Sequence, residues 1–153
     1  KSSAASDVYK RQTMIDFMAS EEDICAILRS SLSCVISDAT YPTEGQRHPR
    51  VCGNVTHLLE HFVREKKALS WEQAVHKLTG RPAQVLGLTG KGRLEAGCDA
   101  DVCMFAPEAL HERATYTEPQ QTSQGMSLVL VAGEIALENG KPTGICAGRA
   151  VRR

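Results

Sequence analysis

Residues 33–38 read Ser-Cys-Val-Ile-Ser-Asp, a short apolar run of β-type residues that ends in an acid. Such a run is typical of a strand covered on both faces, so we predict a buried strand that stops at Asp38. Residues 39–53 follow, with two prolines and two glycines, and are too polar to pack. A loop of that length is too long for a simple connection and usually serves a site. The sequence therefore places a candidate site directly after Asp38.

Helical patterns lie on both sides of this stretch. Ser20 and Ser70 each open a capping box, in which a serine side chain caps the helix and a polar residue follows three positions later. Apolar residues at helical spacing follow each cap. We expect helices over residues 21–31, from a cap at Asn54 to about Lys66, from Ser70 to a stop at Gly80, and from Pro82 to Gly87.

The pattern changes near Gly90, after which short β-like runs alternate with turn residues. We expect strands over residues 93–96, 101–105, 128–131 and 134–137. Ala132-Gly133 joins the last two as a tight hairpin turn. Residues 107–125 are polar, which predicts a long surface loop.

Composition excludes several functional classes. The 153 residues contain 18 Lys plus Arg and 18 Asp plus Glu, so the net charge gives no footprint for nucleic acid or anionic lipid. No apolar run approaches the length of a membrane span. The six cysteines show no C-x-x-C spacing, which favours reduced, structural thiols in a cytoplasmic protein. We expect one soluble globular unit or a piece of a larger protein, with no nucleic-acid or membrane partner.

The first twelve residues are expected to have a different origin from the rest. Residues 2–12 read Ser-Ser-Ala-Ala-Ser-Asp-Val-Tyr-Lys-Arg-Gln, which resembles the translation of a common transposase-tagmentation sequencing adapter. They show no apolar periodicity and no signal-peptide order. We therefore expect residues 1–12 to be non-native and the natural frame to extend upstream of Thr13.

Several short strings together resemble one family of enzymes. Ser-Asp, followed ten residues after Asp38 by His-Pro-Arg, is similar to the carboxy-terminal third of the N-acyl-D-amino-acid deacylases (D-aminoacylases) of the amidohydrolase superfamily. A Gly-x-x-Ala-Asp-Val string is shared more widely in the superfamily. The strings lie at residues 35–39, 48–53, 62–66, 70–75, 79–83, 97–102 and 129–133.

This resemblance implies an α/β fold in which Asp38 ends the last strand of a metal-dependent (β/α)8 TIM barrel. Residues 13–90 would be the C-terminal part of that barrel, and residues 91–153 part of a small β-sandwich of the urease-like composite type. A barrel needs about 250 residues, so this chain holds only its final strand and helices.

The resemblance also implies a zinc-dependent hydrolase that splits N-acyl-D-amino acids into a D-amino acid and a carboxylate. Asp38 would take a proton from a zinc-bound water and pass it to the leaving amine. The zinc-binding histidines would lie upstream, so no metal ligand is predicted in this chain. A structural alternative is that Asp38 only caps the following turn.

Arg50, supported by His48, is the candidate for binding the substrate. The planar guanidinium matches the carboxylate that an N-acyl amino acid presents. A purely structural anchor in the loop is the alternative. The family usually continues Gly-Thr-Phe-Pro-Arg, whereas residues 53–57 read Gly-Asn-Val-Thr-His, which leaves the preferred D-amino acid open.

Other functions compete with this hypothesis. Within the superfamily, the substrate could instead be a cyclic amide, as in dihydroorotases and hydantoinases, although Arg50 in its His-Pro-Arg context argues against it. Residues 57–61 spell H-x-x-E-H, the inverted zinc-peptidase helix, which needs a further ligand on a helix. The isolated chain is expected to be inactive, because it has no complete set of metal ligands, and prone to aggregate through exposed apolar surface.

Overall fold

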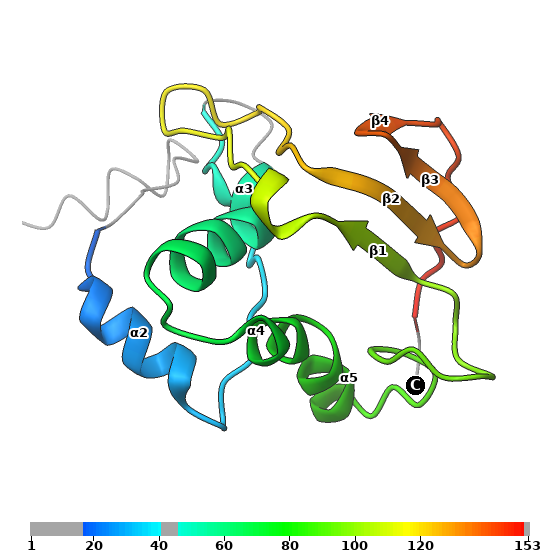
Figure 1. Ribbon diagram of the computed structural model, residues 1–153, viewed down its shortest axis with the longest axis horizontal. Coiled ribbons are helices and arrows are strands. Elements are labelled where there is room, and N and C mark those ends of the chain that lie inside the picture. Colours follow the sequence, from blue (N-terminus) through cyan, green and yellow to red (C-terminus); the bar gives the residue numbers. More distant parts are fainter. Residues whose placement is uncertain (1–16, 41–45, 152–153) are drawn as a thin grey trace, which may run out of the picture.

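The computed structural model describes residues 17–40 and 46–151. Helices occupy one side of the molecule and an antiparallel sheet the other (Figure 1). The expected adapter-like segment, residues 1–12, lies outside the described residues. The elements are α2 (Glu21–Arg29), α3 (Arg50–His57), the π-helix η1 (Leu58–Glu65), α4 (Trp71–Leu78), α5 (Gly80–Leu86), β1 (Val102–Phe105), the 3-10 helix η2 (Pro107–Ala109), β2 (Met126–Val131), β3 (Glu134–Glu138) and β4 (Lys141–Pro142).

The helices form where the capping residues predict them. Ser20 accepts a hydrogen bond from the Asp23 backbone at 3.1 Å, and Ser70 and Gln73 form a complete capping box. Gly87 ends α5 in the left-handed conformation, with φ +69°. The helix expected to begin at Pro82 is α5, which begins slightly earlier, at Gly80.

One helix begins earlier than the sequence predicts. The helix expected from Asn54 starts at Arg50, so the loop expected to reach residue 53 ends at Pro49. The fixed φ of proline, here −57°, suits the first turn of a helix, and the His48 side chain accepts a hydrogen bond from the first helical N–H, that of Arg50. After His57 the chain continues as a π-helix, a rare form that is frequent at functional sites.

The predicted strand over residues 33–38 is wrong for this structure, because the segment is irregular. Strands need a neighbour to satisfy their backbone groups, and no segment within the described residues forms a ladder with it. Its Val35 N–H donates instead to the Lys77 carbonyl at 3.0 Å. The strand expected over residues 93–96 is also absent, replaced by turns and bends.

The sheet has the strand order β1-β2-β3-β4 and is antiparallel throughout. Ala132 and Gly133 both have positive φ, as a tight hairpin turn between β2 and β3 requires. The short strand β4 was not predicted. Part of the expected surface loop is buried: Leu110 is 1% exposed, and Ala114 and Pro119 are also buried.

The hydrophobic core lies between the helices and this loop. Leu59, Phe62 and Val63 of η1 pack with Leu28 of α2 and with Leu110. Much apolar surface remains exposed nearby. The exposed fraction is 83% for Leu32 and 68% for Ile36. Exposed apolar area of this kind promotes association. No helix among the described residues is long and apolar enough to cross a membrane.

Lys77 connects α4 to the turn after α2. It is only 7% exposed, and its ammonium donates to the Ser30 carbonyl at 2.5 Å and to the carbonyl and hydroxyl of Ser33 at 3.2 and 2.9 Å.

Replacing this lysine should destabilise the chain. Lys77→Met leaves the acceptors of Ser30 and Ser33 unpaired, which should lower the free energy of unfolding by about 1–3 kcal/mol. Urea denaturation measures the change. The control Lys141→Met, on an exposed side chain, should change it by less than about 0.5 kcal/mol. Equal losses for both variants would contradict this account.

Candidate active site

Asp38 lies at the end of the irregular segment and faces the first residue of α3. Its carboxylate Oδ2 is 3.4 Å from Nη2 of Arg50, and its side chain is 77% exposed. The Asp38 backbone is left-handed, with φ +45°, a conformation that aspartate tolerates better than most residues. Because the side chain is exposed, this ion pair adds little stability.

Arg50 is the first residue of α3 and offers binding capacity beyond this pair. Its side chain is 35% exposed, yet its Nε is buried and has no hydrogen-bond partner within the described residues. A buried donor normally has a partner, so the unpaired Nε is unusual, and the guanidinium reaches solvent through its terminal nitrogens. A guanidinium of this kind can bind a carboxylate through two nitrogens.

His48 holds the start of the same helix. Its Nδ1 accepts a hydrogen bond from the Arg50 backbone N–H at 3.0 Å. Nδ1 therefore carries no proton, and the neutral ring has its proton on Nε2. Burial, and secondly the positive charge of Arg50, lower the pKa of His48. The ring is thus neutral at pH 7, as its capping role requires.

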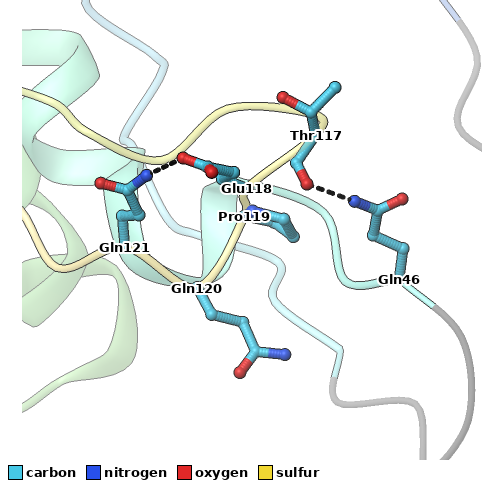
Figure 2. A pocket seen from close by; sticks show the side chains of 6 residues that line it. All are labelled: Gln46, Thr117, Glu118, Pro119, Gln120 and Gln121. Carbon is cyan, nitrogen blue, oxygen red and sulfur yellow. Dashed lines mark hydrogen bonds between the residues drawn. The ribbon is translucent and has the colours of Figure 1, made fainter.

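The three residues predicted as a site therefore lie together. Sequence reasoning missed the loop that flanks them: the Tyr116 ring packs edge-on against His48, with centroids 5.4 Å apart. Gln46 donates to the Thr117 carbonyl at 2.7 Å beside an open hollow that residues 117–121 line (Figure 2). No local sequence signal predicts these contacts, because the partners lie about seventy positions apart.

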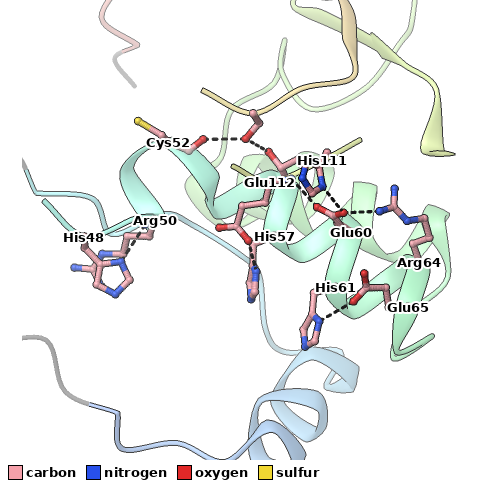
Figure 3. A network of polar contacts seen from close by, with 12 residues as sticks. His48, Arg50, Cys52, His57, Glu60, His61, Arg64, Glu65, His111 and Glu112 are labelled. Carbon is pink, nitrogen blue, oxygen red and sulfur yellow. Dashed lines mark hydrogen bonds and ion pairs between the residues drawn. The ribbon is translucent and has the colours of Figure 1, made fainter. Parts of the chain in front are cut away.

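A second polar network ties η1 to the same loop (Figure 3). Glu60 accepts hydrogen bonds from Arg64 at 2.6 Å and from the Glu112 backbone at 2.5 Å, and its Oε1 lies 2.9 Å from Nδ1 of His111. Burial favours a higher pKa for Glu60. The hydrogen bonds from Glu112 and His111, together with the positive charges of His111 and Arg64, outweigh it and lower the pKa. Arg64 also donates to the carbonyls of Pro107 and Leu110.

The side chains of the H-x-x-E-H stretch, the alternative zinc-peptidase motif, contact other residues in this structure. The rings of His57 and His61 stack with centroids 5.2 Å apart, but Glu60 is engaged by Arg64 and His111 instead. Both ring nitrogens of His61 face carboxylates, those of Glu21 and Glu65. The described residues contain no group of three or more His, Cys, Asp or Glu side chains that could hold a metal ion.

The sequence pattern of the Amidohydrolase family matches residues 22–137. The chain belongs to this family. It is 38% identical over 130 residues to N-acyl-D-aspartate deacylase of Alcaligenes xylosoxydans xylosoxydans, a match that covers 85% of this chain and 26% of that amidohydrolase. The chain therefore spans about a quarter of the length of this relative. A dihydroorotase of Lactobacillus helveticus matches less, with 33% identity over 52% of this chain and 21% of that enzyme.

Solved amidohydrolases share this fold. D-aminoacylase, described as defining a novel subset of amidohydrolases, has a TM-score of 0.83 and 33% identity, covering 90% of this chain and 29% of its own. N-acyl-D-glutamate deacylase of Bordetella bronchiseptica was solved with zinc and a phosphonate inhibitor. It has a TM-score of 0.73 and 37% identity, and the match covers 76% of this chain and 24% of the deacylase. The predicted family and fold class are confirmed, whereas the boundary near residue 90 stays a prediction.

The pKa values of His48 and His61 are shifted in opposite directions from the ordinary value for histidine. Burial lowers the pKa of His61, but the hydrogen bonds to Glu21 and Glu65 raise it by more. The net result is a raised pKa. His61 should therefore titrate above about 6.5 and His48 below it, as NMR of the ring protons can measure. The stabilisation from His61 is present below about pH 6.5 and is lost as pH rises through its raised pKa.

A control variant tests whether the carboxylates of Glu21 and Glu65 raise the pKa of His61. Glu65→Gln removes one of the carboxylates at His61 and should return its pKa toward the ordinary value without changing that of His48. Finding that His48 titrates above His61 in the unmodified chain would contradict the described contacts.

Proposed function

We propose that the whole protein to which this chain belongs hydrolyses the amide bond of N-acyl-D-amino acids, and that Asp38, Arg50 and His48 act in that site. The proposal rests chiefly on one observation. A carboxylate and a guanidinium, neither of them buried, lie 3.4 Å apart in a chain 38% identical to N-acyl-D-aspartate deacylase. Proton transfer and carboxylate binding are what this reaction needs.

Arg50 binds the carboxylate of the substrate. Without substrate its partner is Asp38, and a substrate carboxylate offers a second acceptor to the same fork. His48 supports this role, since its Nδ1 fixes the backbone at Arg50. Substrate would thus be anchored at the carboxylate, with its acyl-amide group beside Asp38.

Asp38 moves the proton. In amide hydrolysis, water adds to the carbonyl carbon and loses a proton, the carbon–nitrogen bond breaks, and the leaving amine gains a proton. A carboxylate next to the amide can accept the first proton and deliver the second. Its exposed position leaves it accessible to substrate.

Zinc is the metal we propose for the whole enzyme, because the Bordetella relative was solved with zinc. The residues described here do not fit a zinc site by themselves, since they include no group of three suitable ligands. We therefore assign no step to the metal. Its ligands would be supplied by parts of the enzyme outside this chain, and a cytoplasmic location remains a prediction.

A cyclic-amide hydrolase is the second candidate, because the dihydroorotase match covers about half of the chain. The deacylases match more of it, 85% for the aspartate enzyme. Comparing N-acetyl-D-amino acids with dihydroorotate as substrates distinguishes the two functions.

A chimera tests the proposed roles. Residues 17–151 would replace the matching stretch of N-acyl-D-aspartate deacylase, and release of D-aspartate from N-acetyl-D-aspartate would be measured. Asp38→Asn should lower kcat by about 10²–10⁴-fold, the usual contribution of a positioned acid–base group. Arg50→Gln should mainly raise KM. The control Arg93→Gln, on an exposed side chain, should change neither.

Two outcomes would contradict these roles. One is an active chimera that Asp38→Asn leaves at full kcat. The other is an equal rise of KM in Arg50→Gln and Arg93→Gln, which would show a general effect of charge.

The chain by itself should not catalyse the reaction. We expect no D-aspartate from N-acetyl-D-aspartate when the 153-residue protein is supplied with Zn²⁺, because the described residues lack a ligand group for the metal. The active chimera is the positive control. Zinc-dependent, chelator-sensitive deacylation by the chain alone would show that it holds a complete site.

A further inference from the structure

The turn at residues 115–118 is stiffened by its own hydrogen bonds. The Thr115 N–H donates to the Glu118 carbonyl at 3.2 Å, and the Glu118 N–H donates to the Thr115 hydroxyl at 2.9 Å. The hydroxyls of Thr115 and Thr117 lie 3.1 Å apart, and Pro119 beyond the turn is buried. A turn fixed in this way presents Tyr116 in one orientation.

Two contacts join this turn to the segment that carries the site. Gln46 donates to the Thr117 carbonyl at 2.7 Å, which holds the backbones together (Figure 2). The edge of one ring meets the face of the other where Tyr116 packs on His48, at 5.4 Å and an interplanar angle of 76°. Phe17 packs against Tyr116 in a similar T-shaped arrangement at 5.0 Å.

The ring of Tyr116, and not its hydroxyl, makes these contacts. No hydrogen bond of the hydroxyl is found within the described part of the chain, while two aromatic neighbours contact the ring. T-shaped packing depends on ring geometry, so an aliphatic side chain of similar size does not replace it. Phenylalanine at this position should therefore act like tyrosine, and leucine should not.

We propose that Tyr116 is a positioning residue for the site, which fixes the His48 ring so that Nδ1 caps Arg50 and sets the guanidinium beside Asp38. The chain of contacts is direct: Tyr116 touches His48, His48 bonds the Arg50 backbone, and Arg50 pairs with Asp38. A ring free to rotate about its Cβ–Cγ bond would turn its Cδ2–H toward the Arg50 N–H in place of Nδ1. The backbone N–H would then lose its acceptor, and Nδ1 would be free to take the ring proton. The effect on substrate rests on the proposed function, whereas the effect on His48 does not.

The 153-residue chain itself allows the first test. ¹⁵N NMR reports which ring nitrogen of His48 is protonated, and amide exchange reports the Arg50 N–H. In the unmodified chain and in Tyr116→Phe, Nδ1 of His48 should be unprotonated. Tyr116→Leu should show a mixture of tautomers and amide exchange at Arg50 about five- to tenfold faster, as for the loss of one ordinary hydrogen bond.

Two controls keep this test decisive. Unchanged amide signals in β2 and β3 show that the variants are folded. The ring of His76, which lies on α4, should keep its tautomer in all three proteins. An unchanged His48 in Tyr116→Leu overturns the proposal, and so does equal loss in Tyr116→Phe, because the hydroxyl would then be responsible.

The chimera supplies the second readout. Tyr116→Leu should raise KM for N-acetyl-D-aspartate several-fold with kcat nearly unchanged, and Tyr116→Phe should restore the KM of the parent. An inactive parent chimera would count against the proposed function alone, since the NMR result on His48 does not depend on it. Equal KM in Tyr116→Leu and the parent would overturn the link from His48 to substrate binding.

Discussion

The structure depends on one partly buried carboxylate, that of Glu60. Its side chain is 13% exposed, and a charge with so little contact with water is stabilised by ion pairs and hydrogen bonds. Arg64, His111 and the Glu112 backbone supply those partners (Figure 3). Arg64 also donates to the Pro107 and Leu110 carbonyls. This cluster fixes the loop before β2 against η1, with Leu110 buried beneath it. Removing one partner would leave charge uncompensated, so the loop and the helix hold each other in place.

The site follows from this attachment. Glu112 also reaches over α3, where its carboxylate lies 2.6 Å from Nδ1 of His57. A Cβ at Gly53 would lie 2.5 Å from that carboxylate, so a larger residue there would displace the Glu112 side chain. Thr56 donates to Ser123 at 2.5 Å as a further contact between helix and loop. Because the loop is held along α3, its turn at Tyr116 is brought to His48, at the end of α3 that carries Arg50.

Local features of the sequence predict local structure well. The capping boxes at Ser20 and Ser70, the stop at Gly87 and the turn at Ala132-Gly133 each depend on a few adjacent residues, and each is found. The strand expected over residues 33–38 failed because strands depend on partners that lie elsewhere. The residues of the candidate site were predicted from a carboxylate at the end of an apolar run, a nearby arginine and the family resemblance, and in the structure these residues lie together. Tyr116 and the bonds of Glu60 were missed because they join positions far apart in sequence, and the π-helical form of η1 has no signal that we recognise.

In the proposed mechanism, Arg50 binds the substrate carboxylate while Asp38 faces the amide. The most direct measurement is a crystal structure of the chimera with a phosphonate analogue of an N-acyl-D-aspartate. Our account predicts the Arg50 guanidinium within hydrogen-bond distance of the ligand carboxylate, and the Asp38 carboxyl group against the phosphonyl oxygens. A ligand whose carboxylate is bound by other residues, with Arg50 still paired only with Asp38, would contradict it.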